Sequence, residues 1–213
     1  MKFSDREKAI QRYSERLDRL GATVQALGWR NKEQQYLRFE ILSTIGDLHG
    51  RSVLDVGCGF GDFYTYLNER GIEVDYVGID ISPEILDEAR RCHPQIDFRQ
   101  VDLLVDDFGE TFDYVVESGI FNHEVDDNEQ FAHDMLTAMF GRCKIGIAAN
   151  MMTSYVDYRD EYLYYYDPKL IFDFARILSR FVAVRHDYPL YEFTLCLYRQ
   201  SPFIASTAPS PTS

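Results

Sequence analysis

Apolar residues in the first part of the chain recur at the three- and four-residue spacing of an α-helix. The first such run predicts a helix over residues 5–27 that Gly28 ends. Asn31, followed three residues later by Gln34, resembles a capping box and predicts the start of a second helix. We expect these two helices to form an N-terminal helical cap over residues 1–48.

The pattern changes after residue 50, where short apolar runs alternate with amphipathic segments. Five runs predict buried strands, over residues 53–56, 76–80, 96–104, 112–117 and 144–150. The segments between and after them predict helices over residues 62–70, 83–93 and 127–140, the last closed by Gly141, and a final helix capped by Asp167-Pro168. Strands separated by helices predict a doubly wound α/β fold, with a parallel sheet covered on both faces.

The end of the chain has a different pattern. Residues 181–186 and 193–199 flank a turn at Pro189 and predict an antiparallel hairpin at the edge of the sheet. Residues 201–213 contain no charge, three prolines and many small polar residues, which is typical of a disordered tail. We therefore expect a single domain over residues 1–200.

Charge and composition exclude several classes of partner. Lys and Arg total 22 against 35 Asp and Glu, so the formal net charge is -13. A negative field disfavours nucleic acid and anionic membrane surfaces. No apolar run approaches the roughly 18 residues of a membrane span. The charged N-terminus and four separate cysteines predict a cytoplasmic protein with reduced thiols and no cysteine-based metal site.

A glycine-rich turn, Gly57-x-Gly59-x-Gly61, follows the first predicted strand. In an open parallel sheet this position lies at the ligand-binding edge. A dinucleotide site has a third glycine in the pattern G-x-G-x-x-G, but Asp62 occupies that place. An aspartate there would repel a pyrophosphate, so a nucleoside ligand without phosphates fits better than a nicotinamide or flavin dinucleotide.

Three aspartates end or closely follow three consecutive predicted strands. Asp55 can order the turn or face a cationic ligand, and Asp80 can accept hydrogen bonds from ribose hydroxyls. Asp102 can accept a hydrogen bond from an exocyclic amine. Each could instead cap the next helix, since Asp is a favoured N-cap residue. Their repetition beside a glycine turn favours a binding site.

Four segments resemble the successive motifs of class I S-adenosylmethionine-dependent methyltransferases: VLDVGCGFGDF (53–63), YVGIDIS (76–82), VDLL (101–104) and FDYVVESGIF (112–121). The resemblance covers residues 50–150, and the terminal hairpin corresponds to the sixth and seventh strands of that family. It implies a Rossmann-like seven-stranded sheet and S-adenosylmethionine as cofactor. An acidic site suits this cofactor, because its sulfonium is a cation.

The resemblance also implies which residues bind the cofactor. Asp80 would hold the ribose, and Ile81 would pack on the adenine. Asp102 and Leu103 would reach the adenine edge, and Glu117 would begin the motif that faces the reacting centre. The residues lining the methionine part would be Asp55, Gly57, Gly59 and Gly61.

Residues for the acceptor are indicated by position. The region around Gln34 and Arg38 is similar to small bacterial members of the family. The Arg38 guanidinium could bind a carboxylate of the cofactor or of the acceptor, or it could pair with a neighbouring acid of the protein. His123 is the candidate base, if an acceptor proton must leave. Tyr155 and Tyr165 belong to a tyrosine-rich segment that would cover the acceptor pocket, although their helix-like spacing also suits a packing face. Acidic residues near His123 are more simply helix N-terminal charge than metal ligands.

The fourth-strand motif restricts the acceptor class. Methyltransferases acting on nucleic-acid bases typically carry an Asn/Asp-Pro-Pro-aromatic loop there, whereas this chain has ESGIFNH (117–123). We therefore expect transfer of a methyl group to a small-molecule acceptor by in-line displacement. Alternatives are an enzyme that cyclises or cleaves the cofactor without an external acceptor, a non-catalytic cofactor-binding partner protein, and a nucleotide-dependent oxidoreductase.

Overall fold

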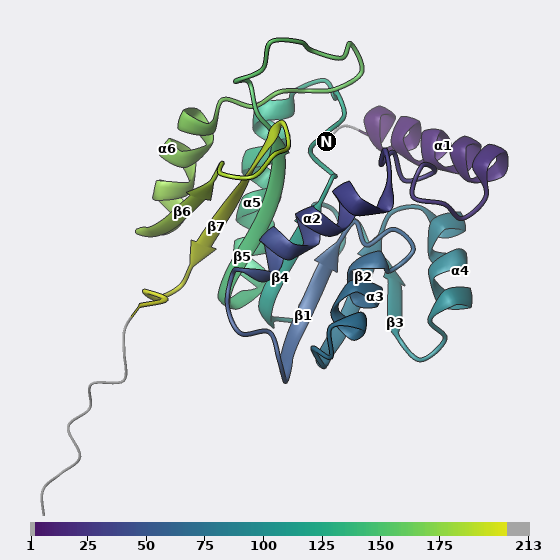
Figure 1. The fold of residues 1–213 in the computed structure, drawn as a ribbon, viewed down its shortest axis with the longest axis horizontal. Coiled ribbons are helices and arrows are strands. Elements are labelled where there is room, and N and C mark those ends of the chain that lie inside the picture. Colours follow the sequence, from purple (N-terminus) through teal and green to yellow (C-terminus); the bar gives the residue numbers. More distant parts are fainter. Residues whose placement is uncertain (1–2, 204–213) are drawn as a thin grey trace, which may run out of the picture.

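The chain forms one seven-stranded sheet in the order β3-β2-β1-β4-β5-β7-β6 (Figure 1). We describe residues 3–203 from a computed structural model. Six strands run parallel, and β7 runs antiparallel between β5 and β6. The predicted Rossmann-like sheet with its closing hairpin is confirmed. The antiparallel strand of the hairpin, β7, is the second strand from the edge, and β6 is the edge strand. The strands are β1 (Arg51–Val56), β2 (Val74–Asp80), β3 (Asp97–Gln100), β4 (Phe112–Ser118), β5 (Cys143–Met152), β6 (Phe181–Arg185) and β7 (Glu192–Tyr198).

Within residues 3–203, six helices accompany the sheet: α1 (Phe3–Leu20), α2 (Lys32–Ser43), α3 (Asp62–Glu69), α4 (Pro83–Cys92), α5 (Asn128–Arg142) and α6 (Pro168–Leu178). Their starts follow local chemistry. The side chains of Asn31, Ser82 and Asp167 each accept a hydrogen bond from a backbone N–H in the first turn, which confirms these predicted caps. Proline at the first position fits α4 and α6, since its missing N–H would be unpaired there.

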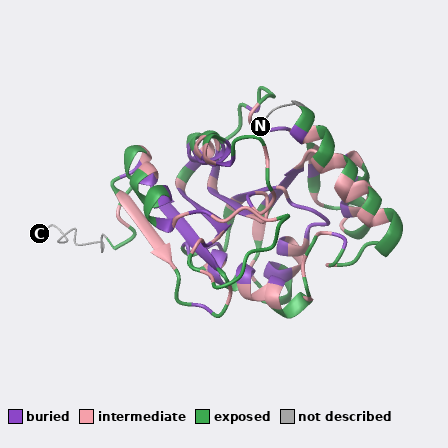
Figure 2. Ribbon diagram, turned by 90° about the horizontal axis from the view of Figure 1, so that it is seen from above, coloured by how far each residue is buried: buried purple, intermediate pink, exposed green. Residues whose placement is uncertain are grey.

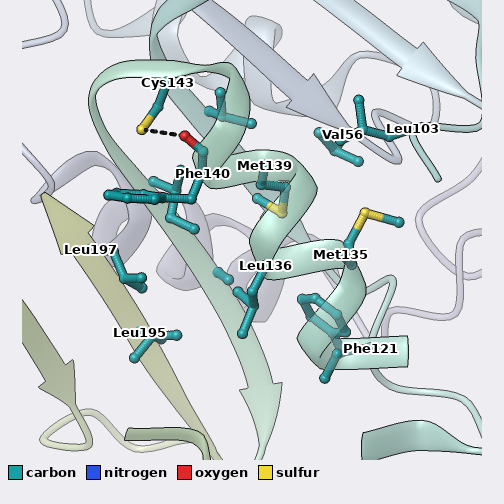
Figure 3. Packing of buried hydrophobic residues seen from close by; sticks show 14 of the residues in the cluster. Val56, Leu103, Phe121, Met135, Leu136, Met139, Phe140, Cys143, Leu195 and Leu197 are labelled. Carbon is teal, nitrogen blue, oxygen red and sulfur yellow. Dashed lines mark hydrogen bonds between the residues drawn. The ribbon is translucent and has the colours of Figure 1, made fainter. Parts of the chain in front are cut away.

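Two apolar layers hold the helices against the sheet. One face packs on α5 and α6 through a cluster that includes Leu136, Met139 and Leu195 (Figure 3). The other face packs on α2, α3 and α4, with Leu42 and Leu67 in the cluster. Figure 2 shows the strands as mostly buried and the outward sides of the helices as exposed. The sheet is therefore covered on both faces, which explains its nearly continuous apolar runs.

The helix α1 lies apart from these layers, at the end of the sheet toward which the parallel strands point (Figure 1). It rests on a small cluster of Ala26, Phe60 and Ile85, against which Tyr13 and Leu17 pack. This contact holds the N-terminal segment over the carboxyl ends of β1 and β2.

Three predicted boundaries were wrong. The first helix ends at Leu20 rather than Gly28, because Gly21 adopts a φ of 65° and turns the chain. The third strand is only Asp97–Gln100, because the Asp102 side chain accepts from the Leu104 N–H and folds the next residues into a turn. The fifth helix continues past Gly141 to Arg142.

Other expectations concern segments without regular structure or outside the description. The tyrosine-rich segment from Ser154 to Tyr165 contains turns and short bridges rather than a helix, so the predicted amphipathic packing face is absent there. Most of the predicted disordered tail, from residue 204 onward, lies outside the described residues. Within residues 3–203, no helix has both the length and the apolar character of a membrane span.

Candidate active site

A cavity of about 830 Å³ lies at the carboxyl ends of β1, β2 and β4. Its floor is made by residues of four segments that follow strands, 55–63, 80–85, 101–103 and 118–126. Its roof is made by residues 5–39, from α1, the turn after it and α2. Short segments around residues 160–163 and 189–192 close the sides. The cavity is thus completed by parts of the chain that are far apart in sequence.

The glycine turn forms the centre of the floor. Gly57 and Gly59 have φ angles of 73° and 56°, a backbone conformation that favours glycine. A Cβ on Gly57 would lie 2.2 Å from Ile120 Cγ2, and one on Gly59 would lie 2.9 Å from Leu27 Cδ1. Gly61 also has a positive φ, but its Cα faces Phe98 and His93 rather than the cavity. The sequence-based placement of Gly61 in the cavity wall was therefore wrong, since it serves the turn and its packing.

Asp55 is a buried acid in the floor. Its carboxylate accepts a hydrogen bond from the Tyr76 hydroxyl of the neighbouring strand. Burial raises the pKa of Asp55 to about 7, the charges of Asp80 and Asp62 act in the same direction, and the Tyr76 hydrogen bond opposes the rise. Such a carboxylate gains from a positive charge placed beside it.

Asp80 and Asp102 also line the cavity, and neither caps a helix. Asp80 accepts from Gly59 N at 3.2 Å and from Ser82 N at 3.0 Å, and burial raises its pKa. Asp102 is buried and accepts from Leu104 N at 3.0 Å. The helix caps in this region are Gly61 and Ser82. Capping of the next helix therefore does not explain these two acids.

Two further predicted residues, Ile81 and Leu103, line the cavity beside Asp80 and Asp102. Glu117 does not. Its side chain is fully buried behind the wall, where one oxygen accepts from Ile120 N at 3.2 Å and Oε1 has no hydrogen-bond partner. Burial raises the pKa of Glu117 well above its usual range. The motif that Glu117 begins does line the cavity, through Ser118, Gly119 and Ile120, whereas the side chain of Glu117, predicted to bind the cofactor, lies outside the lining.

Asp62 begins α3 and also lines the cavity. Its carboxylate accepts from Gln35 Nε2 at 2.9 Å, and burial raises its pKa. An acid at this helix N-terminus occupies the place where a dinucleotide pyrophosphate would bind. The structure therefore places in the cavity wall the acid on which the sequence argument against dinucleotides rests.

One face of α1 supplies a large share of the roof. Its cavity-lining residues recur every three or four positions: Asp5, Lys8, Ala9, Arg12, Tyr13 and Arg16. An ion pair between Arg6 Nε and Asp102 Oδ2, at 3.5 Å, connects this helix to the floor. Burial raises the pKa of the Tyr13 hydroxyl, and the charge of Asp80 raises it further, which places this ring close to the second strand's end.

Arg38 lines the cavity but is already paired. Its Nε donates to both carboxylate oxygens of Glu192, at 2.9 Å and 2.8 Å, and Nη2 donates to Glu192 as well. Nη1 donates to Gln34 O at 2.9 Å, and the guanidinium lies 4.5 Å from the centre of the Trp29 ring. Both charged groups are buried, so each needs the other. Arg38 is therefore not available as the predicted carboxylate clamp, whereas Gln34 remains in the wall.

His123 lies in the cavity wall below α1. Its ring meets that of Tyr13 edge to face at 6.0 Å between centroids, and Nδ1 has no hydrogen-bond partner. Burial lowers the pKa of His123 to about 4, and the charges of Arg12 and Arg16 lower it further. The imidazole is therefore neutral at physiological pH, and the same burial makes it a weak base.

The predicted tyrosines of the acceptor pocket are elsewhere. Tyr155 is exposed and lies outside the cavity wall, and the Tyr165 hydroxyl accepts from Asp160 N at 2.9 Å, also outside it. The segment does reach the cavity, as its position after β5 predicted, but neither Tyr155 nor Tyr165 is among the residues that line it. Tyr162 and Leu163 line the cavity instead, since Leu163 forms a β-bridge with His123.

Sequence reasoning missed the roof face of α1 and the partner of Arg38. The spacing of Lys8, Arg12 and Arg16 was a readable signal, because residues four apart share a helix face. Glu192 had no local signal, since it lies 154 positions from Arg38. Among residues 3–203, no group of three His, Cys, Asp or Glu side chains is arranged to hold a metal ion.

Comparison with known proteins supports one class. A family described as "Methyltransferase domain" matches residues 53–140. A Mycobacterium tuberculosis protein with the name "Putative methyltransferase Rv1506c" is 40% identical over 164 residues, which cover 70% of this chain and 94% of that protein. A trans-aconitate 2-methyltransferase of Azoarcus is 35% identical over 80 residues, 33% of this chain and 32% of that enzyme.

Solved structures agree in fold. A magnesium protoporphyrin IX methyltransferase from Synechocystis, with bound SAM, superposes with a TM-score of 0.61 at 18% identity, covering 78% of this chain and 79% of that one. A TehB-like SAM-dependent methyltransferase from Corynebacterium glutamicum covers 92% of this chain and 97% of that chain, with a TM-score of 0.55 at 19% identity.

Proposed function

Because this chain belongs to the class I S-adenosylmethionine-dependent methyltransferases, we propose that it transfers a methyl group to a small-molecule acceptor bound beneath its N-terminal roof. The observation that carries this proposal is the enclosure of the cavity by α1 and α2. A volume of about 830 Å³ is near the upper end of the roughly 300–1,000 Å³ range of small-molecule sites. It offers room for the cofactor together with a modest acceptor.

The floor fits the cofactor. Gly57 and Gly59 keep the turn free of side chains where a ligand must approach the backbone, and Asp80 at the second strand's end can accept from ribose hydroxyls. In our proposal, Ile81 packs on the adenine, and Asp102 with Leu103 meets its edge. Asp55 would face the methionine part, whose positive charges suit a buried acid.

The protein's own task in this reaction is mainly alignment. S-adenosylmethionine supplies an electrophilic methyl group on a sulfonium, and in-line displacement needs the acceptor atom held opposite the sulfur. The roof and the side segments exclude water from that line. Where the acceptor carries a proton that must leave, His123 in the cavity wall is our candidate to receive it, and its pKa of about 4 makes it a weak base at neutral pH.

Calorimetric titration with S-adenosylmethionine, S-adenosylhomocysteine and NADH tests this assignment. We expect both sulfur compounds to bind and NADH not to bind. Asp80→Ala should weaken the sulfur compounds by roughly 5- to 100-fold, as expected for a lost hydrogen-bond acceptor. Asp75→Ala, on the exposed side of the same strand, is the matched control and should bind normally.

Two results would contradict the proposal. NADH binding without the sulfur compounds would mean that Asp62 does not exclude a dinucleotide. Adenosine-containing products formed from S-adenosylmethionine alone would indicate cofactor cleavage or cyclisation rather than transfer. Chromatography after incubation of the protein with this cofactor, without an acceptor, checks the second result.

A further inference from the structure

The cavity has two surfaces of opposite charge. Asp55, Asp80 and Asp102 lie in the floor, whereas Arg12 and Arg16 extend from the roof. The net charge of -13 does not predict this, since it is a property of the whole chain. A ligand that spans the cavity would thus meet the acids of the floor at one end and, at the other, a roof that carries these guanidinium groups together with Asp5.

The roof cations differ in whether they are paired. Arg6 contacts Asp102, Lys8 contacts Asp5 with Nζ 3.7 Å from Oδ1, and Arg38 is held by Glu192. Arg12 and Arg16 form no ion pair and no side-chain hydrogen bond with any residue in the described part of the chain. Both are half-buried.

Arg16 is the more constrained of the two. Its Nη1 is shielded from solvent and has no hydrogen-bond partner within residues 3–203. The same atom lies 2.8 Å from where a Cβ on Gly28 would be, so the guanidinium is packed against the turn that follows α1. A buried donor without a partner is unfavourable, and a ligand oxygen would satisfy it.

The surroundings of these arginines favour an anion. His123 is neutral, and its low pKa follows from burial and from the charges of Arg12 and Arg16, whereas the pKa of Tyr13 also responds to the charge of Asp80. Tyr13 brings a hydroxyl to the same wall. The planar fork of a guanidinium matches a carboxylate, with two parallel hydrogen bonds.

We propose that Arg12 and Arg16 bind a carboxylate of the acceptor, so that the enzyme methylates a small organic acid. This inference rests on the proposed methyl transfer and adds the chemical class of the acceptor. A carboxylate could also come from the methionine end of the cofactor, and the experiment must separate these two sources.

The experiment uses Arg12→Gln, Arg16→Gln and the double variant, with Arg19→Gln as the matched control. Arg19 is an exposed arginine on the same helix and lies outside the cavity wall. The first arm measures the affinity of each protein for S-adenosylhomocysteine and for 5′-methylthioadenosine, which lacks the carboxylate. The second arm titrates protein saturated with S-adenosylhomocysteine with succinate, citrate and cinnamate, each beside its uncharged amide.

We expect at least one acid to bind the wild-type complex better than its amide. Each cavity arginine variant should weaken that acid by about 10-fold or more, as expected for a charge-assisted hydrogen bond, with Arg19→Gln unchanged. Affinity for S-adenosylhomocysteine should stay within about threefold of wild type.

Other outcomes overturn the inference. If the variants weaken S-adenosylhomocysteine but not 5′-methylthioadenosine, and acid binding is unchanged, the arginines hold the cofactor's own carboxylate. If no acid binds better than its amide, the acceptor is not an acid of this class. Failure of the wild-type protein to bind S-adenosylhomocysteine would instead contradict the proposed function, before the second arm begins.

Discussion

The buried carboxyl of Asp55 predicts that cofactor affinity depends on pH. Its pKa is about 7 in the free protein, mainly because of burial. The neutral form therefore predominates at pH 6 and the ionised form at pH 8. Only the ionised form attracts the positive charges of S-adenosylmethionine, so affinity should rise with pH across this interval. The ionised fraction rises from roughly one tenth to nine tenths, which predicts about a 9-fold gain in affinity.

The assay is calorimetric titration with S-adenosylmethionine at pH 6, 7 and 8 in constant salt. Asp55→Asn keeps an oxygen that can accept from Tyr76, but it cannot ionise, so its affinity should not rise with pH. 5′-Methylthioadenosine, which lacks both positive groups, is the matched ligand and should bind wild type equally at each pH. His123 does not complicate the interval, because its pKa is about 4. Our reasoning is refuted if wild type shows no gain, or if Asp55→Asn shows the same gain.

Three further predictions concern buried contacts around the cavity. Because its pKa is raised, Glu117 keeps its proton in the folded protein, whereas in the unfolded chain it releases the proton above about pH 4.3. This group therefore stabilises the fold at low pH, and that contribution is lost as pH rises through the folded pKa. Glu117→Gln should therefore flatten the loss of stability with rising pH. A variant whose urea midpoint falls as steeply as that of wild type between pH 5 and pH 8 would contradict this. Glu192→Ala leaves the buried Arg38 guanidinium unpaired and should lower the free energy of unfolding by about 3–5 kcal/mol. The double variant Arg38→Met with Glu192→Leu replaces the ion pair by an apolar contact and should recover most of this loss in the same denaturation assay. Gly57→Ala places a methyl group 2.2 Å from Ile120 Cγ2, at a residue with a positive φ. It should therefore lower the free energy of unfolding by at least about 1 kcal/mol and weaken cofactor binding, whereas an unchanged melting curve would show that the turn adapts.

Local signals in the sequence predicted most of the fold. Caps such as Asn31 and Ser82 act within their own turn, so a short segment contains all the information they need. Strand positions followed from apolar runs, because a parallel sheet is buried on both faces. The third strand was predicted too long, because the residues after Gln100 are mostly apolar but form a turn instead of continuing the strand. The Asp102 side chain stabilises this turn by accepting a hydrogen bond from the Leu104 N–H.

The site was predicted less completely, because its walls come from distant segments. The floor residues Asp55 and Asp80 follow strands and could be placed from them. The pairing of Arg38 with Glu192 depends on where β7 inserts into the sheet, which no local pattern shows. Likewise, Tyr162 rather than Tyr155 reaches the wall, because the segment turns instead of forming a helix.

The roof has a consequence for how such enzymes diverge. The family match spans residues 53–140, whereas the residues of α1 and α2 that line the cavity precede it, and those at 152–192 follow it. The part of the chain that the family shares therefore contains the floor and His123, whereas the roof, beneath which we propose that the acceptor binds, is supplied from outside it. Exchange of the N-terminal segment between relatives would thus alter the choice of acceptor while the nucleoside end keeps its contacts. Relatives with the same floor can accordingly serve unrelated metabolites, and a shared floor identifies the donor of the methyl group rather than its recipient.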